Sequence, residues 1–259
     1  MDSFPNHFET PEDAYHGFFR ADSAKSAEGW AAVMSYPHVR VSSRGRLYYC
    51  ETPEQYAAEA DWAAREATGW VRSVGHDPVR LHTSEHVVHL VGGWTRYNKD
   101  DEPILTNQVT YILTRPESSW GIQARLGVDS FTRDGDDGGR AAVAVAEDYV
   151  EAHRKGDYDT GVQYIRYPFV QIGVGGVVRI DDAVAMRSFI SQAPSNEVVE
   201  SHVEAVQVGS NGVVASLTRK YSRGFTEESV GLVARDETGK WKIAGASAIL
   251  QTQDHDTDN

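Results

Sequence analysis

Residues that could perform acid–base chemistry begin on a short segment near position 40. His38 and Arg40 alternate with valines, so the period-two spacing of a strand places both polar side chains on one face. A histidine titrates near neutral pH and could act there as a base or a hydrogen-bond donor at a pocket mouth. A polar strand face turned to solvent explains the same spacing. The matching places in the second half hold Phe169 and Gln171, which favours the solvent-facing interpretation.

A second polar face lies on a later segment. Gln123 and Arg125 alternate with apolar residues, and Asp129 extends the same side. Arg125 could hold an anionic oxygen and Asp129 could act as an acid or base. An interface or a surface salt bridge would use the same residues, and this alternative stays open. The candidate catalytic residues are His38, Arg125 and Asp129, together with Tyr111 from the aromatic residues of the first half.

Aromatic residues are frequent in the first half of the chain and could line a pocket for a flat organic ligand. Packing in a core or between domains is the simpler explanation for most of them. The candidate ligand-binding residues are Arg40, Tyr48, Trp62, Trp94 and Gln123.

Three histidines, His82, His86 and His89, lie within eight residues and raise the question of a metal site. A turn at 83–85 would point His86 and His89 to opposite faces, and the spacing matches no helical zinc motif. We expect exposed strand histidines and no metal. The glycine-rich run 173–176 lacks the Lys-Ser/Thr and the following helix of a phosphate loop, so it predicts a hairpin turn. No motif indicates a cofactor.

The elements that must position these residues occur twice. Tyr36-Pro37 is matched 131 residues later by Tyr167-Pro168, and Trp120-Gly121-Ile122 is matched 121 residues later by Trp241-Lys242-Ile243. The second copy is thus about ten residues shorter in its middle. In each copy, helices with capping signals come first and a run of strands joined by short turns follows. This order predicts an α+β fold of two tandem domains, each with three helices on one face of a strongly curved antiparallel sheet.

The predicted helices start at Thr10, Ser26, Thr52, Ala141 and Asp181, with a further short helix after Asp157. The third is expected to run unbroken over 52–68. We place domain one at 1–131, a polar glycine-rich linker at 132–139, domain two at 140–250 and a disordered tail at 251–259.

Composition limits the partners. The 259 residues carry a formal net charge of −13, which disfavours nucleic acid and anionic membranes. Cys50 is the only cysteine, so an intrachain disulfide and a cysteine-based zinc site are excluded. The start of the chain lacks the features of a signal peptide, and no apolar stretch approaches the roughly 20 residues that span a bilayer. We expect a cytoplasmic protein.

The order of features resembles the SnoaL-like and ketosteroid-isomerase-like superfamily, also called nuclear-transport-factor-two-like. The resemblance rests on the two Tyr-Pro strands, on the helix ending in 155–158 and on the closing segments 119–122 and 239–243, and it covers about 10–131 and 139–249. It implies two cones, each built from three helices and a bent sheet around a pocket. Two fused cones could bury their open sheet faces against each other as an internal pseudo-dimer, in a monomer or a homodimer.

The resemblance does not select a reaction, because the superfamily includes isomerases, dehydratases, cyclases, epoxide hydrolases and transport adaptors. Its isomerases and cyclases commonly carry an acidic base on or just after the first strand. Neither 37–50 nor 168–180 contains Asp or Glu, so that base is not carried over. The places matching Gln123 and Arg125 hold alanines in copy two, which predicts that copy one keeps the polar pocket and copy two is mainly structural.

Two functions remain. The first is a small-molecule-binding protein, with cofactor-independent isomerase, lyase or cyclase chemistry on an apolar or aromatic substrate in the domain one pocket. The alternative is a non-catalytic ligand-binding or protein-interaction scaffold of the same fold.

Overall fold

The computed structural model describes residues 4–44, 46–128, 137–192 and 198–252.

The helices of copy one begin where the sequence offers a capping side chain. Helix α1 (Pro11–Ser23) starts after Thr10, whose Oγ1 accepts a hydrogen bond from the Asp13 amide. Ser26, Thr52 and Asp61 cap the next three helices in the same way: α2 (Ala27–Ala32), α3 (Pro53–Ala58) and α4 (Trp62–Glu66).

The prediction of one helix over 52–68 is wrong, because α3 and α4 are separate. The reason is local: the Asp61 side chain accepts a hydrogen bond from the Ala64 amide at 2.9 Å and starts a new helix. This short helix carries Arg65 toward the interior of the cone.

The strands of copy one form one sheet in the order β2-β1-β7-β6-β5-β3, with β4 also on β5. Strand β1 runs antiparallel to β2 and parallel to β7, a detail that the sequence did not indicate. The strands are β1 (Met34–Ser42), β2 (Leu47–Cys50), β3 (Arg72–Gly75), β4 (Val79–Thr83), β5 (Val87–Tyr97), β6 (Pro103–Thr114) and β7 (Gly121–Val128).

Copy two repeats this sheet from the other edge, in the order β10-β11-β12-β13-β8-β9, and again its first strand β8 is parallel to the closing strand β13. Its strands are β8 (Ile165–Gly173), β9 (Gly176–Ile180), β10 (Val198–Val208), β11 (Gly212–Tyr221), β12 (Phe225–Arg235) and β13 (Trp241–Thr252). Its helices are α5 (Asp137–Arg154), α6 (Tyr158–Gly161) and α7 (Ala183–Ser191), with a short 3-10 helix at Val162–Tyr164. The predicted α+β fold of two tandem copies is confirmed.

Several boundaries differ from the expected ones. Helix α5 begins at Asp137, inside the segment expected to be a linker, and β13 continues to Thr252. Strand β1 begins at Met34 and passes through Tyr36-Pro37; both Tyr-Pro bonds are cis. Residues 132–136 of the expected linker and 253–259 of the expected tail lie outside the described residues.

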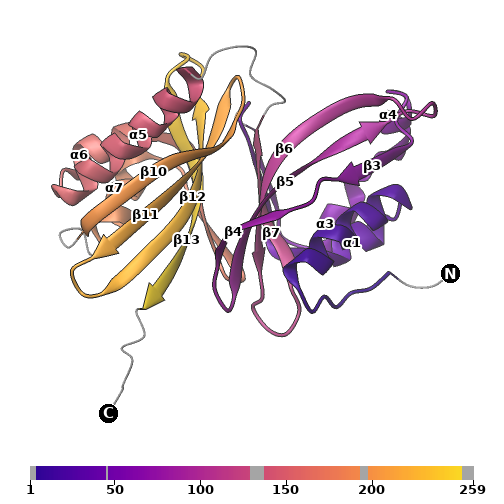
Figure 1. Cartoon of the computed structure of the whole chain (residues 1–259), viewed down its shortest axis with the longest axis horizontal. Coiled ribbons are helices and arrows are strands. Elements are labelled where there is room, and N and C mark those ends of the chain that lie inside the picture. Colours follow the sequence, from indigo (N-terminus) through magenta and orange to yellow (C-terminus); the bar gives the residue numbers. More distant parts are fainter. Residues whose placement is uncertain (1–3, 45, 129–136, 193–197, 253–259) are drawn as a thin grey trace.

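The helices of each copy lie on the side of its sheet that faces away from the other copy (Figure 1). In copy one, Tyr15 and Phe18 of α1 and Trp30 of α2 are buried in one cluster with Leu113 of β6, on the inner face of the sheet. A separate cluster fills the inside of copy two, around Phe169, Met186 and Ile190. Each copy therefore has its own interior.

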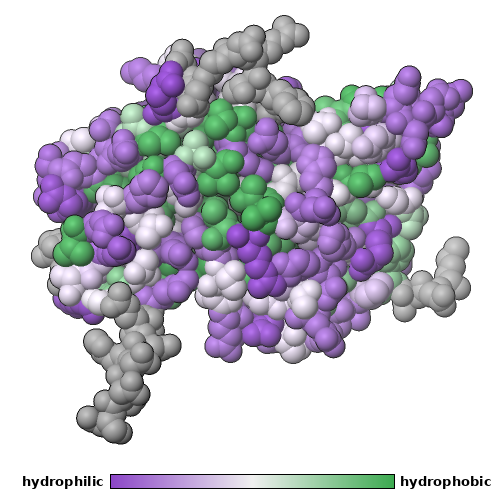
Figure 2. All heavy atoms as spheres, in the orientation of Figure 1, coloured by the Kyte–Doolittle hydropathy of each residue, from purple (hydrophilic) through white to green (hydrophobic). Residues whose placement is uncertain are grey.

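A third cluster joins the two copies. It contains Val39, Val41 and Leu126 of copy one together with Val170 and Leu232 of copy two, all buried. On the face shown in Figure 2, hydrophobic residues gather over the middle of the molecule, where the two sheets meet. The apolar face of β1 and β7 is thus covered by the sheet of copy two.

Polar side chains cross the same interface. The Thr110 hydroxyl donates to Gln207 Oε1 at 2.9 Å, and Gln207 Nε2 donates to the Gly92 carbonyl at 2.8 Å. His82 and His89 are buried here, contrary to the expectation of exposed strand histidines, whereas His86 is exposed. Among the described residues, no helix combines the length and the apolar composition that crossing a bilayer requires.

Candidate functional site

The interior of copy one contains a cavity of about 250 Å³, which we call cavity one. Its wall is partly aromatic and apolar, and the rest is charged or polar. The lining residues are Phe18, Phe19, Asp22, Arg40, Val41, Ser42, Arg65, Ser73, Trp94, Arg96, Asn107, Val109, Arg125 and Gly127. In the part of the chain that the structure describes, four arginines and one carboxylate therefore line it.

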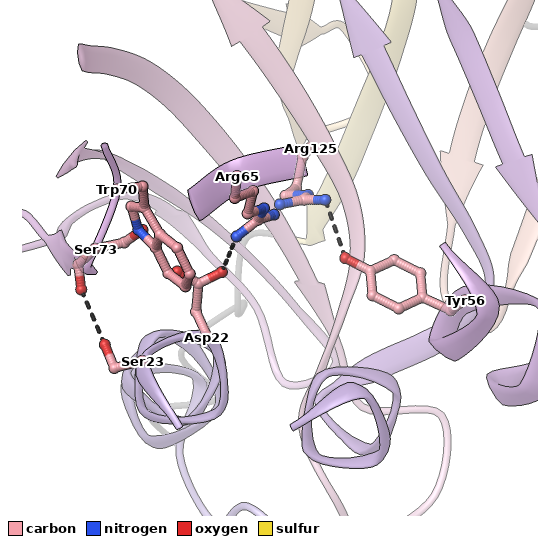
Figure 3. A network of polar contacts seen from close by, with 7 residues as sticks. All are labelled: Asp22, Ser23, Tyr56, Arg65, Trp70, Ser73 and Arg125. Carbon is pink, nitrogen blue, oxygen red and sulfur yellow. Dashed lines mark hydrogen bonds and ion pairs between the residues drawn. The ribbon is translucent and has the colours of Figure 1, made fainter. Parts of the chain in front are cut away.

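Asp22 and Arg65 form an ion pair at the wall. Asp22 lies in the last turn of α1, and its side chain is only 2% exposed. Arg65 Nη1 donates to Asp22 Oδ1 at 2.5 Å, as Figure 3 shows. Asp22 Oδ2 is buried and has no hydrogen-bond partner among the described residues. One carboxylate oxygen of Asp22 is thus paired with Arg65, and the other is free to accept a hydrogen bond.

Aromatic rings hold Arg65 in this position. Its guanidinium carbon lies 4.3 Å from the Trp30 ring centroid, 5.2 Å from that of Trp62 and 5.6 Å from that of Trp70. Such cation–π contacts stabilise a guanidinium away from water. Trp62, a predicted ligand residue, therefore packs around Arg65 and is not one of the residues that line the cavity.

Arg125 reaches the cavity from β7. Its Nη2 donates to the Tyr56 hydroxyl at 3.0 Å, and its guanidinium lies 5.0 Å from the Phe18 ring centroid. In Figure 3 the guanidinium groups of Arg65 and Arg125 point toward one another. Two like charges are thus brought together in a partly buried space.

Arg40 and Arg96 complete the positive wall. The Arg40 guanidinium stacks 3.8 Å from the ring centroid of Tyr48, which is a predicted ligand residue outside the cavity wall. Burial and the charge of Arg125 lower the pKa of Arg40. Arg96 lies 4.9 Å from the ring centroid of Trp94. Burial and the charge of Arg65 lower the pKa of Arg96. The positive charges of Arg40 and Arg96 are therefore not fully compensated by neighbouring groups.

A β-bulge in β7 decides which way Arg125 points. Ile122 packs in the cluster inside copy one, whereas Ala124 packs in the cluster between the copies. In the register of β7 with β6, Leu113 pairs with Ile122 and Ile112 with Ala124, so Gln123 is an extra residue on β7. The simple alternation expected for this strand is therefore wrong, because the bulge reverses the faces and sends Arg125 into the cone.

Gln123 itself is fully buried and bound to the protein. Its Oε1 accepts from the Thr114 hydroxyl at 2.9 Å, and its Nε2 donates to the Pro37 carbonyl. It is absent from the cavity wall. Its contacts are those of a residue that stabilises the bulge.

His38 and Tyr111, two predicted catalytic residues, lie behind the cavity wall and do not line it. His38 is fully buried, so the solvent-facing interpretation is wrong. Its Nδ1 donates to the Ile122 carbonyl at 2.8 Å, while its Nε2 has no partner among the described residues. Burial, with Arg125 and Arg40 nearby, holds the pKa of His38 well below its usual range.

The Tyr111 hydroxyl is also buried without a partner in the described residues, and burial raises its pKa well above 10. Asp129 lies outside the described residues. Of the predicted residues, Arg40, Trp94 and Arg125 are thus brought together at cavity one.

Sequence reasoning missed three of the charged residues. Asp22 follows Ala14 and Phe18 at intervals of four, so a carboxylate on the apolar face of a helix was a usable signal. Arg65 and Arg96 lie on elements whose inner face became clear only from the tertiary structure.

Copy two has a smaller and less polar cavity of about 100 Å³, which we call cavity two. Its lining includes the ion pair between Arg219 and Glu227, and Glu227 also accepts from the Tyr221 hydroxyl at 3.0 Å. The place of Arg125 is taken by Ala246, 121 residues later. The charges inside copy two are therefore compensated by the chain itself.

No three His, Cys, Asp or Glu side chains that could hold a metal ion come together within the described residues. His82 and His89 form a cross-strand pair in the interface between the copies, with their Nδ1 atoms 3.0 Å apart.

Several solved structures are similar to this chain. One is a domain of unknown function with a cystatin-like fold from Nostoc punctiforme, with a TM-score of 0.39 and 17% identity over 46% of this chain and 74% of that chain. Another is an NTF-2-like protein of unknown function from Silicibacter pomeroyi, with a TM-score of 0.34 and 19% identity over 43% and 94%. A third is a ketosteroid isomerase-like protein from Erwinia carotovora, with a TM-score of 0.36 and 14% identity over 46% and 99%.

No protein-family model and no curated protein matches the chain. Each of the three alignments covers less than half of this chain.

Proposed function

We propose that this protein binds a small organic molecule in cavity one, and that copy two is a scaffold that covers the sheet of copy one. The observation that carries the proposal is the contrast between the two interiors. Cavity one has more than twice the volume of cavity two, and among the described residues four arginines and one carboxylate line it, against one arginine and one carboxylate in cavity two. A pocket with apolar walls and a few converging polar groups is the usual form of a small-molecule site.

Native mass spectrometry of the protein as purified tests the proposal, with one cavity-filling variant in each copy. Gly127 and Ala248 occupy matching places 121 residues apart and line the two cavities. A Cβ at Gly127 would meet its nearest atom, the Val41 carbonyl oxygen, at 3.8 Å, so Gly127→Leu fits the backbone and fills cavity one. We expect the wild type and Ala248→Leu to retain an organic molecule that Gly127→Leu loses.

If Gly127→Leu still retains the molecule and Ala248→Leu loses it, the working pocket is in copy two and the proposal is contradicted. A ligand-free mass in every variant would favour the scaffold alternative.

Catalysis is a second candidate, favoured by Asp22. Its unpartnered Oδ2 at the cavity wall is placed to take a proton from a carbon of the ligand, while adjacent guanidinium groups hold the negative charge that develops on a ligand oxygen. In an isomerisation the C–H electron pair stays on the ligand, Oδ2 holds the proton, and the proton returns to another carbon. This is the lyase or isomerase function expected from the sequence, with Asp22 in place of the residues named there.

Deuterium uptake tests this candidate. The molecule released from the protein is incubated with the protein in D2O, and its mass is followed. We expect carbon-bound deuterium with the wild type and none with Asp22→Asn; equal uptake with both proteins would exclude Asp22 as the base.

A further inference from the structure

Resting on the proposed function, we propose that the ligand of cavity one is an organic anion. Its acid group, a carboxylate or a chemically similar group, binds at Arg125 between Arg40 and Arg65, and its flat apolar body lies against Phe18, Phe19 and Trp94.

The first observation is the local excess of positive charge. The whole chain has a formal net charge of −13, yet four guanidinium groups and one carboxylate line cavity one among the described residues. That carboxylate, Asp22, is already bound by Arg65. Arginines concentrated in one cavity of an acidic protein create a positive potential where a small anion is favoured over the rest of the surface.

The second observation is the register of the strands. Arg40 and Arg125 are direct neighbours on the parallel strands β1 and β7, and both side chains reach the cavity. Like charges side by side on one sheet face destabilise the fold. Arg65, from α4, adds a third guanidinium that points toward Arg125 (Figure 3). An anion between these groups would turn the repulsion into attraction.

The third observation is the unfilled donors. The Nε atoms of Arg40, Arg96 and Arg125 are buried and have no hydrogen-bond partner among the described residues. A guanidinium donates five N–H groups and accepts none, so what is missing is an acceptor. The planar fork of Arg binds the two oxygens of a carboxylate with matching geometry, and such charge-assisted bonds are stronger than neutral ones.

Copy two supplies the contrast within the same chain. There the Nε of Arg219 also has no partner among the described residues, but Arg219 is paired with its own carboxylate, Glu227, and the places of Arg40 and Arg125 hold Gln171 and Ala246. The charge of Arg219 is thus compensated within copy two. The excess positive charge in cavity one would be compensated by a ligand.

A pair of matched probes separates this inference from the proposed function. Naphthoate and naphthamide share one flat ring system and differ in charge. We expect the full chain to bind naphthoate at least about tenfold more tightly than naphthamide in isothermal titration calorimetry, since charge-assisted bonds are lost with the neutral probe. Raising the salt concentration should weaken the binding of naphthoate only.

Variants identify the site. Arg125→Gln and Arg40→Gln should each weaken naphthoate about tenfold or more and leave naphthamide nearly unchanged. Arg187→Gln removes the same charge from the exposed surface of copy two and should change neither affinity. Circular dichroism checks that each variant is folded. Because the two arginines lie on different strands, one variant still tests the inference if the other misfolds.

Equal affinity for the two probes, abolished by Gly127→Leu, would overturn the anion inference and leave the proposed function in place. Tighter binding of naphthoate that survives both Arg variants would also overturn the inference. No binding of either probe up to its solubility would count against both proposals.

Discussion

His82 and His89 show how a single side-chain contact can set a pH dependence. Their Nδ1 atoms lie 3.0 Å apart, and their outer nitrogens contact Ser216 and Ser247 of copy two at 3.2 and 3.0 Å. One Nδ1 must donate and the other accept, so protonation of both rings would bring two N–H groups together. Burial and the neighbouring His82 lower the pKa of His89 to about 3.

We expect the free energy of unfolding to fall as the pH is lowered from about 6.5 toward 4. The folded pKa of His89 is below the unfolded value of 6.5, so in this window the unfolded chain binds more protons. The stabilisation is complete above pH 6.5 and is lost on acidification, by up to about 1.4 kcal/mol per pH unit. Burial also lowers the pKa of His82, against the opposing effect of Glu228 and Glu204, and that of His38.

Urea unfolding at several pH values measures this dependence. His89→Asn should make the decline shallower, whereas His86→Asn removes an exposed histidine of the same hairpin and should keep the wild-type slope. An unchanged slope in His89→Asn would contradict the assignment.

Among the elements, β7 matters most for the site, because its bulge turns Arg125 inward. The sequence placed Gln123 on the same face as Arg125 and assigned it to the ligand. In the structure its side chain links Thr114 on β6 to Pro37 on β1 across the bulge. The matching residue of copy two, Ala244, is also at a register shift. Both copies therefore have the bulge, but only copy one has a glutamine there.

Gln123→Ala should lower the free energy of unfolding by about 1–3 kcal/mol, because it leaves a buried hydroxyl and a carbonyl without their partner. Gln192→Ala, which removes an exposed glutamine at the end of α7, should cost less than about 0.5 kcal/mol. Chemical denaturation of both variants checks the difference. A loss of naphthoate binding without a loss of stability in Gln123→Ala would instead support the ligand role named from the sequence.

At the scale of the molecule, the two copies meet so closely that one glycine is required at the contact. A Cβ on Gly212 of β11 would collide with the Ser43 side chain and lie 3.2 Å from its Cα. Gly231, in the neighbouring strand β12, has room, since a Cβ there would meet its nearest atom at 3.5 Å. Ser43 is in copy one, so the collision is between the copies.

Gly212→Ala should therefore destabilise the protein by about 1–3 kcal/mol through overpacking of this contact. Gly231→Ala adds the same methyl group to the sheet without the collision and should have a much smaller effect. Ser43→Gly combined with Gly212→Ala should recover part of the loss. Thermal and urea unfolding measure all three; equal effects of the two alanines would mean that the copies do not press together at Gly212.

The apolar cluster between the two sheets also predicts how the two copies are arranged in solution. Because copy two covers the apolar face of β1 and β7, we propose that the two copies form an internal pseudo-dimer in solution. Small-angle scattering should give one compact particle. Two separated lobes without a shared interface would reject the proposal.

The sequence by itself determined the repeat, the order of helices and strands, and thereby the α+β fold. Capping residues, period-two alternation and the paired Tyr-Pro and Trp-x-Ile anchors are local signals, so they survive without tertiary information. Alternation led to Arg40 and Arg125, and the aromatic content of the first half led to Trp94; all three line cavity one.

Only the tertiary structure decided which polar residues meet. The β7 bulge changes the face of every residue after it, and the alternation of residue types alone does not reveal an inserted residue. Asp22, Arg65 and Arg96 come from three elements far apart in the chain, and their convergence depends on how α1 and α4 lie on the sheet. Whether His38 faces solvent or a closed interior was likewise decided by packing, since strand spacing fixes the side of a sheet but not what covers it.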